Sequence, residues 1–168
     1  MAKHIPIYPH CEYLSTTSGL LKICANEQGI SAITFVMQED APAIGNAVTK
    51  EAKQQLSEYF NQQRKAFDLP LAPVGTQFQQ SVWQQLCVIP YGETCSYADI
   101  AKQLNNPNAV RAVGSANGKN PISIVVPCHR VIGANGTLTG YAGGLTRKAA
   151  LLTLENPNFT VPTGKLTT

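Results

Sequence analysis

The sequence is poor in charged and aromatic side chains: 14% of its 168 residues are charged, 7% are aromatic, and one is tryptophan. It has no apolar run near the ~20 residues that a membrane-spanning helix needs, and residues 1–10 lack the apolar core of a signal peptide. A net charge of +3 is too small to indicate a nucleic-acid partner by itself. We therefore expect a cytoplasmic protein without membrane contact.

The cysteines form neither a CxxC pair nor a regular framework. Their number is odd and their spacing wide, which argues against a disulfide scaffold and against a local zinc knuckle. They are Cys11, Cys24, Cys87, Cys95 and Cys128. We expect a reducing compartment and no bound metal.

Charge is distributed unevenly along the chain. Residues 1–75 carry six Lys or Arg against seven Asp or Glu, whereas residues 76–168 carry seven against three. The basic residues of the second half are dispersed, which is typical either of a folded surface that meets phosphate or of solvated helix faces. Pro70, Pro73 and Gly75 lie where the balance changes sign, so we place a domain boundary near residues 71–75 and expect domains 1–75 and 76–168.

The first domain has the pattern of a small α/β module. Short β-branched runs at residues 20–25 and 30–36, separated by a polar turn, predict a β-hairpin. Residues 43–60 carry apolar side chains at helical spacing and predict a helix that packs on this sheet. We expect His4 and His10, near the N-terminus, to have no chemical role.

The second domain begins with helix signals. Thr76 is a candidate N-cap for a helix that carries Trp83 on its apolar face. Ser96 caps a second helix to about residue 104, and Pro107 is expected at the first position of a third helix over 108–116. This helix-turn-helix has small residues and one long cation, Arg111, which suits either DNA binding or close helix packing.

A cysteine beside a histidine follows the third helix. Residues 122–126 predict a short buried strand that leads into Pro127, Cys128 and His129. A reactive cysteine needs a base or cation to form thiolate, and His129 and Arg130 are the candidates beside it. A contact with His129 requires a turn, which Pro127 favours. The alternative is that Cys128 only ends a buried strand as an inert small residue.

The segment NPISIVVPCHRV, residues 120–131, resembles the signature of the O6-alkylguanine-DNA alkyltransferases, also called methylated-DNA–protein-cysteine methyltransferases. The likeness extends to SYADIAKQL at 96–104, AVRAVGSANGKNPI at 109–122, VIGANG at 131–136 and GYAGGLTRKAALLTLE at 140–155, which have the order and spacing of the family's blocks. The close resemblance covers about half of the chain. The N-terminal half resembles the family only in its length and in its order of a hairpin followed by a helix.

The resemblance implies a ribonuclease-H-like α/β domain followed by a mostly helical domain with a helix-turn-helix. It also implies a repair protein that moves the alkyl group of O6-alkylguanine in double-stranded DNA to Cys128, once per molecule, without a cofactor. Such a protein is expected to be a monomer that needs no protein partner. Whether it accepts O4-alkylthymine stays open.

The family's functional residues match individual positions of this chain. Glu155 and His129 would take the thiol proton through a water, Asn120 would brace the turn that carries the cysteine, and Tyr97 would donate a hydrogen bond to the purine. Lys148, Tyr141 and Ala142 would complete the base pocket. Arg111 would enter the base stack, and Val110, Ala112 and Gly114 would let the recognition helix lie in the minor groove.

The sequence departs from the family pattern at some positions, and two other functions fit the same residues. Asn26 and Ser31 occupy two positions of the zinc ligands found in some members, so we expect no structural zinc, and Ala142 stands where some relatives have serine. A helix-turn-helix protein that senses oxidation through Cys128 is the main alternative. A cysteine hydrolase would use the same side chains but would turn over.

Overall fold

The computed structural model describes residues 10–161. The chain divides into two compact units, Met1–Pro73 and Val74–Thr168, each of which is described by itself. The first contains a three-stranded sheet and one helix, and the second contains four α-helices, one 3-10 helix and a two-stranded sheet within the described residues.

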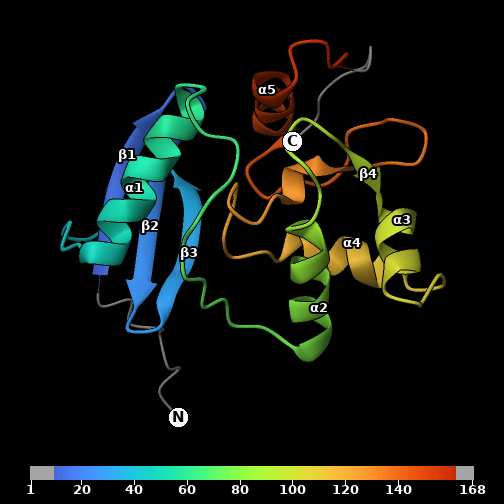
Figure 1. Ribbon diagram of the computed structural model, residues 1–168, viewed down its shortest axis with the longest axis horizontal. Helices are drawn as coiled ribbons and strands as arrows, with labels where there is room; N and C mark the ends of the chain where they lie inside the picture. The colour runs from blue at the N-terminus through green and yellow to red at the C-terminus, as the bar shows by residue number, and fades with distance from the viewer. Residues whose placement is uncertain (1–9, 162–168) are drawn as a thin grey trace. The chain divides into compact units, whose positions relative to one another are not determined.

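The first unit is an antiparallel meander with one helix on it. Strands β1 (His10–Thr16), β2 (Gly19–Asn26) and β3 (Gly29–Val36) lie side by side in that order. Helix α1 (Ala47–Phe60) packs along them (Figure 1). Gly29 has φ +151°, and a Cβ there would lie 2.5 Å from the Pro70 carbonyl oxygen, so this close approach of two backbones requires glycine.

The hairpin predicted at 20–25 and 30–36 is confirmed, since β2 and β3 pair antiparallel. β1 was not predicted, and His10 opens this strand instead of belonging to a free N-terminus; His4 lies outside the described residues. The predicted helix 43–60 begins later, because the side chain of Asn46 caps it by accepting from the Thr49 amide.

The second unit is mostly helical. Its α-helices are α2 (Gln77–Leu86), α3 (Tyr97–Gln103), α4 (Val110–Gly118) and α5 (Leu145–Glu155). The short strands β4 (Cys95–Ser96) and β5 (Val131–Ile132) pair in parallel, and the 3-10 helix η1 (Cys128–Arg130) precedes β5. Figure 1 shows α2, α3 and α4 gathered together, and α4 contacts both of the other two.

Local signals of the second unit are largely confirmed. Thr76 and Ser96 both form capping boxes, at α2 and α3. Trp83 is 3% exposed, and its Nε1 donates to the Ala116 carbonyl at 2.9 Å, which ties α2 to α4. Asn105 takes a left-handed φ of +57° in the turn between α3 and α4, so the helix-turn-helix is present.

Two predictions in this unit are wrong. Pro107 lies in a turn, and α4 starts at Val110, after an N-cap residue, Ala109, that makes no side-chain cap hydrogen bond. Ile122 forms an isolated bridge, and residues 123–126 are turns and bends instead of a strand. The Asn120 side chain bonds the Ile122 amide and the Val126 carbonyl, which a strand would pair with a neighbouring strand.

The mixed α/β fold class is confirmed: a small sheet unit is followed by a helical unit with a helix-turn-helix. Among residues 10–161, none of the helices combines the length and the hydrophobicity required to span a bilayer.

Candidate active site

A braced turn precedes the cysteine. Asn120 is 9% exposed, and its Nδ2 donates to the carbonyls of Val126 at 2.8 Å and Ile122 at 3.2 Å, while its Oδ1 accepts from the Ile122 amide. Ile124, within this turn, has φ +74°, which a β-branched residue rarely adopts. The side chain of Asn120 thus holds a strained loop closed.

Pro127 redirects the chain at the end of this loop. Its φ of −83° and ψ of 64° are those of an inverse γ-turn, closed by the Cys128 amide on the Val126 carbonyl at 2.8 Å. The Arg130 amide then bonds the Pro127 carbonyl, and η1 begins. The turn that the sequence places at Pro127 is therefore present, and Cys128 and His129 lie on a single tight helical turn.

The Cys128 thiol is buried. The residue is 4% exposed, and burial raises the pKa of its thiol. A hydrogen bond with Asn120 and the positive charge of Lys148 act in the opposite direction. At rest the group is a neutral thiol, and these neighbours would stabilise a thiolate once the proton has left.

His129 is oriented by a buried carboxylate. Its Nε2 lies 2.5 Å from Glu155 Oε2, both side chains have no exposed surface, and the buried Nδ1 has no hydrogen-bond partner among residues 10–161. Burial lowers the pKa of the imidazole, although Glu155 opposes this. A neutral ring that donates from Nε2 keeps a lone pair on Nδ1, where it can accept a proton.

Arg130 holds the carboxylate in place. Its Nε donates to Glu155 Oε1 at 2.7 Å and its Nη2 to Oε2 at 3.2 Å, while Nη1 donates to the Ile89 carbonyl. Burial alone would raise the pKa of Glu155, but His129 and Arg130 together lower it to about 2. Glu155 is therefore ionised at neutral pH.

The Gly92 amide adds a further hydrogen bond to Glu155 Oε1 at 3.2 Å. Gly92 has φ +80°, and a Cβ there would lie 3.2 Å from the Glu155 backbone oxygen. Glycine at this position therefore allows the loop after α2 to approach the end of α5.

Lys148 anchors the loop that follows β5. Its side chain is fully buried, and its Nζ donates to the carbonyls of Val131 at 2.5 Å and Thr139 at 2.8 Å. Burial lowers the pKa of this amine to about 8. The Thr139 carbonyl also accepts the Tyr97 hydroxyl at 3.0 Å, and the Lys148 Nζ lies 5.9 Å from the Tyr97 ring centre.

Two further residues lie between this loop and α5. The Tyr141 side chain is partly buried, and burial raises the pKa of its hydroxyl. Ala142 is exposed in the turn before α5. Its methyl group offers neither a hydrogen-bond donor nor an acceptor.

Helix α4 presents a second surface. Val113, Ala116 and Asn117 face the core of the unit, whereas Arg111 and Ala112 are exposed. Val110 is 37% exposed and Gly114 is partly buried, and a Cβ on Gly114 would lie 3.8 Å from the Tyr97 ring. Among the four residues named on this face, Arg111 alone has a long side chain.

The structure brings together most of the expected site residues. His129 and Glu155 form a buried pair, Cys128 is the buried residue that precedes His129 in η1, and Asn120 braces the loop that precedes Cys128. Tyr97 and Lys148 meet at the Thr139 carbonyl. Arg111, Val110 and Ala112 lie apart from this group, on the exposed side of α4.

Sequence reasoning missed the roles of two residues. Arg130 had been noted only as a nearby cation, and its adjacency to His129 was the available signal, because a buried Arg beside a buried base needs a carboxylate. Thr139 contributes through its backbone oxygen, which no side-chain pattern can reveal. Within residues 10–161, no group of three or more His, Cys, Asp or Glu is placed to hold a metal ion.

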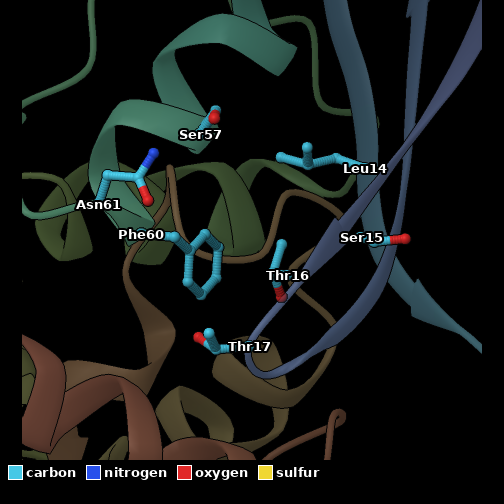
Figure 2. A pocket seen from close by; sticks show the side chains of 7 residues that line it. All are labelled: Leu14, Ser15, Thr16, Thr17, Ser57, Phe60 and Asn61. Carbon is cyan, nitrogen blue, oxygen red and sulfur yellow. The ribbon is translucent and has the colours of Figure 1, made fainter.

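The first unit has a pocket of a different character. Figure 2 shows it between the end of β1 and the end of α1, with Phe60 at its centre. Its lining has hydroxyl, amide and apolar groups but no acid, base or thiol. The lining residues are Leu14, Ser15, Thr16, Thr17, Ser57, Phe60 and Asn61. This pocket therefore offers no side chain for acid-base or thiol chemistry.

Comparisons with known proteins match both parts of the chain to one family. Residues 77–157 match the DNA-binding domain of 6-O-methylguanine DNA methyltransferase, and residues 10–73 match the ribonuclease-like domain of the same family. The methylated-DNA–protein-cysteine methyltransferase of Methanosarcina mazei is 48% identical over 160 residues, which cover 92% of this chain and 94% of that protein. The constitutive methylated-DNA–protein-cysteine methyltransferase of Bacillus subtilis is 51% identical over 155 residues, covering 86% and 93%.

Solved structures are similar over nearly the whole length. The crystal structure of Mycobacterium tuberculosis O6-methylguanine methyltransferase has a TM-score of 0.80 and 43% identity, covering 91% of this chain and 96% of that one. A crystal structure of Mycobacterium tuberculosis OGT in complex with DNA has a TM-score of 0.81 and 44% identity, covering 92% and 96%. With two matched domains and relatives close to half identical, the chain belongs to the 6-O-methylguanine DNA methyltransferase family.

Proposed function

We propose that this protein repairs DNA by transferring the alkyl group of O6-alkylguanine to its own Cys128, one transfer per molecule. The observation that carries the proposal is the buried Cys128, His129 and Glu155 group, in which the imidazole is held through Nε2 and leaves Nδ1 free. An inert buried cysteine needs no such neighbour. The similarity to methylated-DNA–protein-cysteine methyltransferases supports the same chemistry.

The first step is removal of the thiol proton. His129 accepts it at Nδ1, directly or through a water, and the ionised Glu155 stabilises the imidazolium that results. Arg130 keeps Glu155 ionised and oriented. Asn120 and Lys148 stabilise the thiolate, whose formation burial would otherwise disfavour.

The second step is displacement at the alkyl carbon. The Cys128 sulfur forms a bond to this carbon while the bond to guanine O6 breaks, and the electron pair returns to the purine. The Tyr97 hydroxyl donates a hydrogen bond to the purine. To do so it gives up the hydrogen bond to the Thr139 carbonyl that it makes in the free protein. No residue in this mechanism cleaves the thioether that forms, so Cys128 is consumed.

The base pocket would be completed by neighbours of the cysteine loop. Tyr141 and the Lys148-anchored loop would line the approach to Cys128, and Ala142 would lie at its edge. A methyl group at Ala142 leaves room for alkyl groups larger than methyl. O4-alkylthymine would be a second substrate if the pocket tolerates the smaller ring.

DNA contact would use the exposed side of α4. Arg111 enters the base stack and offsets the few kcal/mol that flipping the damaged nucleotide costs. Val110, Ala112 and Gly114 let the helix lie in the minor groove, which carries little sequence information. A protein that repairs lesions at any sequence requires binding without sequence specificity.

Stoichiometry tests the proposal against its alternatives. Increasing amounts of a duplex with one O6-methylguanine are mixed with a fixed amount of protein, and the restored guanine is counted. We expect a plateau at one guanine per protein, no product with Cys128→Ala, and an unchanged plateau with Cys87→Ala, which alters an exposed cysteine.

Two other outcomes would refute the proposal. Continued turnover would indicate a hydrolase, and duplex binding without any product would indicate a DNA-binding redox sensor. Cys128→Ala should still bind the lesion-bearing duplex, because the binding surface on α4 is intact in this variant.

A further inference from the structure

The first unit holds a pair of thiols, far along the chain from Cys128. Cys11 on β1 and Cys24 on β2 are direct cross-strand partners, and their Sγ atoms lie 2.6 Å apart. At this distance either thiol can donate a hydrogen bond to the other. With Ala32 the two cysteines form a small buried cluster.

The strand register suits a covalent link. The Cys11 amide donates to the Ile44 carbonyl at 3.0 Å and therefore points away from β2. In an antiparallel pair, an outward amide marks a non-hydrogen-bonded position, where the facing Cα atoms are about 4.5 Å apart. Disulfides span Cα separations of about 4.4–6.8 Å, so Cys11 and Cys24 need no backbone movement to join.

The pair lies on the sheet face away from α1. Leu14 lines the pocket beside α1, and side chains alternate between faces along a strand, so Cys11, three residues earlier, faces the other way (Figure 2). Cys11 is 6% exposed and Cys24 is 2% exposed. Only a small reagent can reach this cluster, and Cys11 is the more exposed of the two residues.

We propose that Cys11 and Cys24 are an oxidation site that closes to an intramolecular disulfide on reaction with a small peroxide such as hydrogen peroxide. The Cys11 sulfur attacks one peroxide oxygen and the O–O bond breaks. The thiol proton of Cys11 passes to the departing oxygen, so Cys11 becomes a sulfenic acid as water leaves. The Cys24 sulfur then attacks the Cys11 sulfur and the S–O bond breaks. The Cys24 thiol proton joins the departing hydroxyl group, which leaves as water. Two thiols are oxidised and the peroxide is reduced by two electrons.

Closure would fasten an edge of the sheet. Within the described part of the chain, β1 pairs only with β2 in the order β1-β2-β3, so the disulfide adds a covalent tie to a strand with one strand neighbour there. It closes a short loop of the unfolded chain, which disfavours unfolding. We expect the oxidised protein to melt on the order of 10 °C higher than the reduced protein.

Peptide mapping of the full chain tests the site. Reduced protein is treated with hydrogen peroxide, the remaining peroxide is removed, free thiols are alkylated in denaturant, and the protein is digested with trypsin. Lys22 lies between the two cysteines, so they fall in separate peptides that stay joined only by a disulfide. We expect a linked Cys11 and Cys24 peptide that a dithiol reductant separates.

Single cysteine variants provide the controls for this test. Cys24→Ala should lose both the linked peptide and the rise in melting temperature, and Cys11→Ala serves the same purpose if the first variant does not fold. Cys87→Ala, at an exposed cysteine, should retain both. Alkylated Cys11 and Cys24 after peroxide treatment, a link to another cysteine, or over-oxidised Cys11 without a link would overturn the proposal.

Discussion

The most informative perturbation of the site is Glu155→Gln, which removes one charge and almost no volume. The carboxylate accepts hydrogen bonds from His129, from two nitrogens of Arg130 and from the Gly92 amide. An amide offers one oxygen and places an NH2 group against donors. The variant thus leaves the buried Arg130 charge without its counter-ion.

The magnitude follows from the ionisation of Glu155. Its pKa falls from an ordinary 4.5 to about 2 in the folded protein. At about 1.36 kcal/mol per pKa unit, this difference corresponds to about 3 kcal/mol of folding free energy at neutral pH. The same order, about 3–5 kcal/mol, is typical of removing one partner of a buried ion pair.

The pH dependence has a definite sign. The folded-state pKa is depressed, so the carboxylate's contribution is complete above its ordinary pKa of 4.5 and is lost as pH falls toward about 2. The difference in stability between wild type and Glu155→Gln should therefore be largest at neutral pH. It should shrink as the pH is lowered below about 4.5.

Urea unfolding followed by tryptophan fluorescence measures this difference, because Trp83 is the one tryptophan and is buried in the same unit as Glu155. Glu93→Gln, at an exposed carboxylate of that unit, is the matched control and should change stability little. A Glu155→Gln variant as stable as wild type at neutral pH, or one whose deficit stays constant down to about pH 3, would refute the reasoning.

Three further changes have distinct expected outcomes. Arg111→Ala should slow methyl transfer from duplex DNA far more than transfer from free O6-methylguanine, because only the duplex requires flipping; equal effects in parallel kinetic assays would contradict this. Lys148→Met should increase amide hydrogen exchange around Thr139, since two carbonyls lose their buried donor; unchanged protection would argue against the anchoring role. Gly92→Ala should cost about 1–3 kcal/mol in denaturant unfolding because of its positive φ, whereas Gly118→Ala, which meets open space at the end of α4, should be neutral or stabilising.

Much of the fold follows from local signals in the sequence. The caps Thr76 and Ser96 and the hairpin before α1 are fixed by interactions within a few residues, and all were predictable. β1 was missed because its mixed side chains form a strand only once β2 offers a partner. The turn at residues 120–126 was misread as a strand because apolar residues are also buried in a braced loop.

The site divides in the same way. Cys128 and His129 are adjacent in sequence, so their partnership could be inferred from chemistry, and Glu155 and Asn120 entered only through the family resemblance. Arg130 was visible but not assigned, because its bond to Glu155 spans 25 residues and depends on where α5 ends. The Thr139 carbonyl is a backbone group that becomes functional only through tertiary placement.

The central claim is that Cys128 receives the alkyl group. Intact-protein mass and peptide mapping after mixing with excess duplex that carries one O6-methylguanine test this most directly. The claim predicts a gain of a single methyl group, located on Cys128, and no further product afterwards. An unmodified protein that still binds the duplex, or a methyl group on another cysteine, would contradict it.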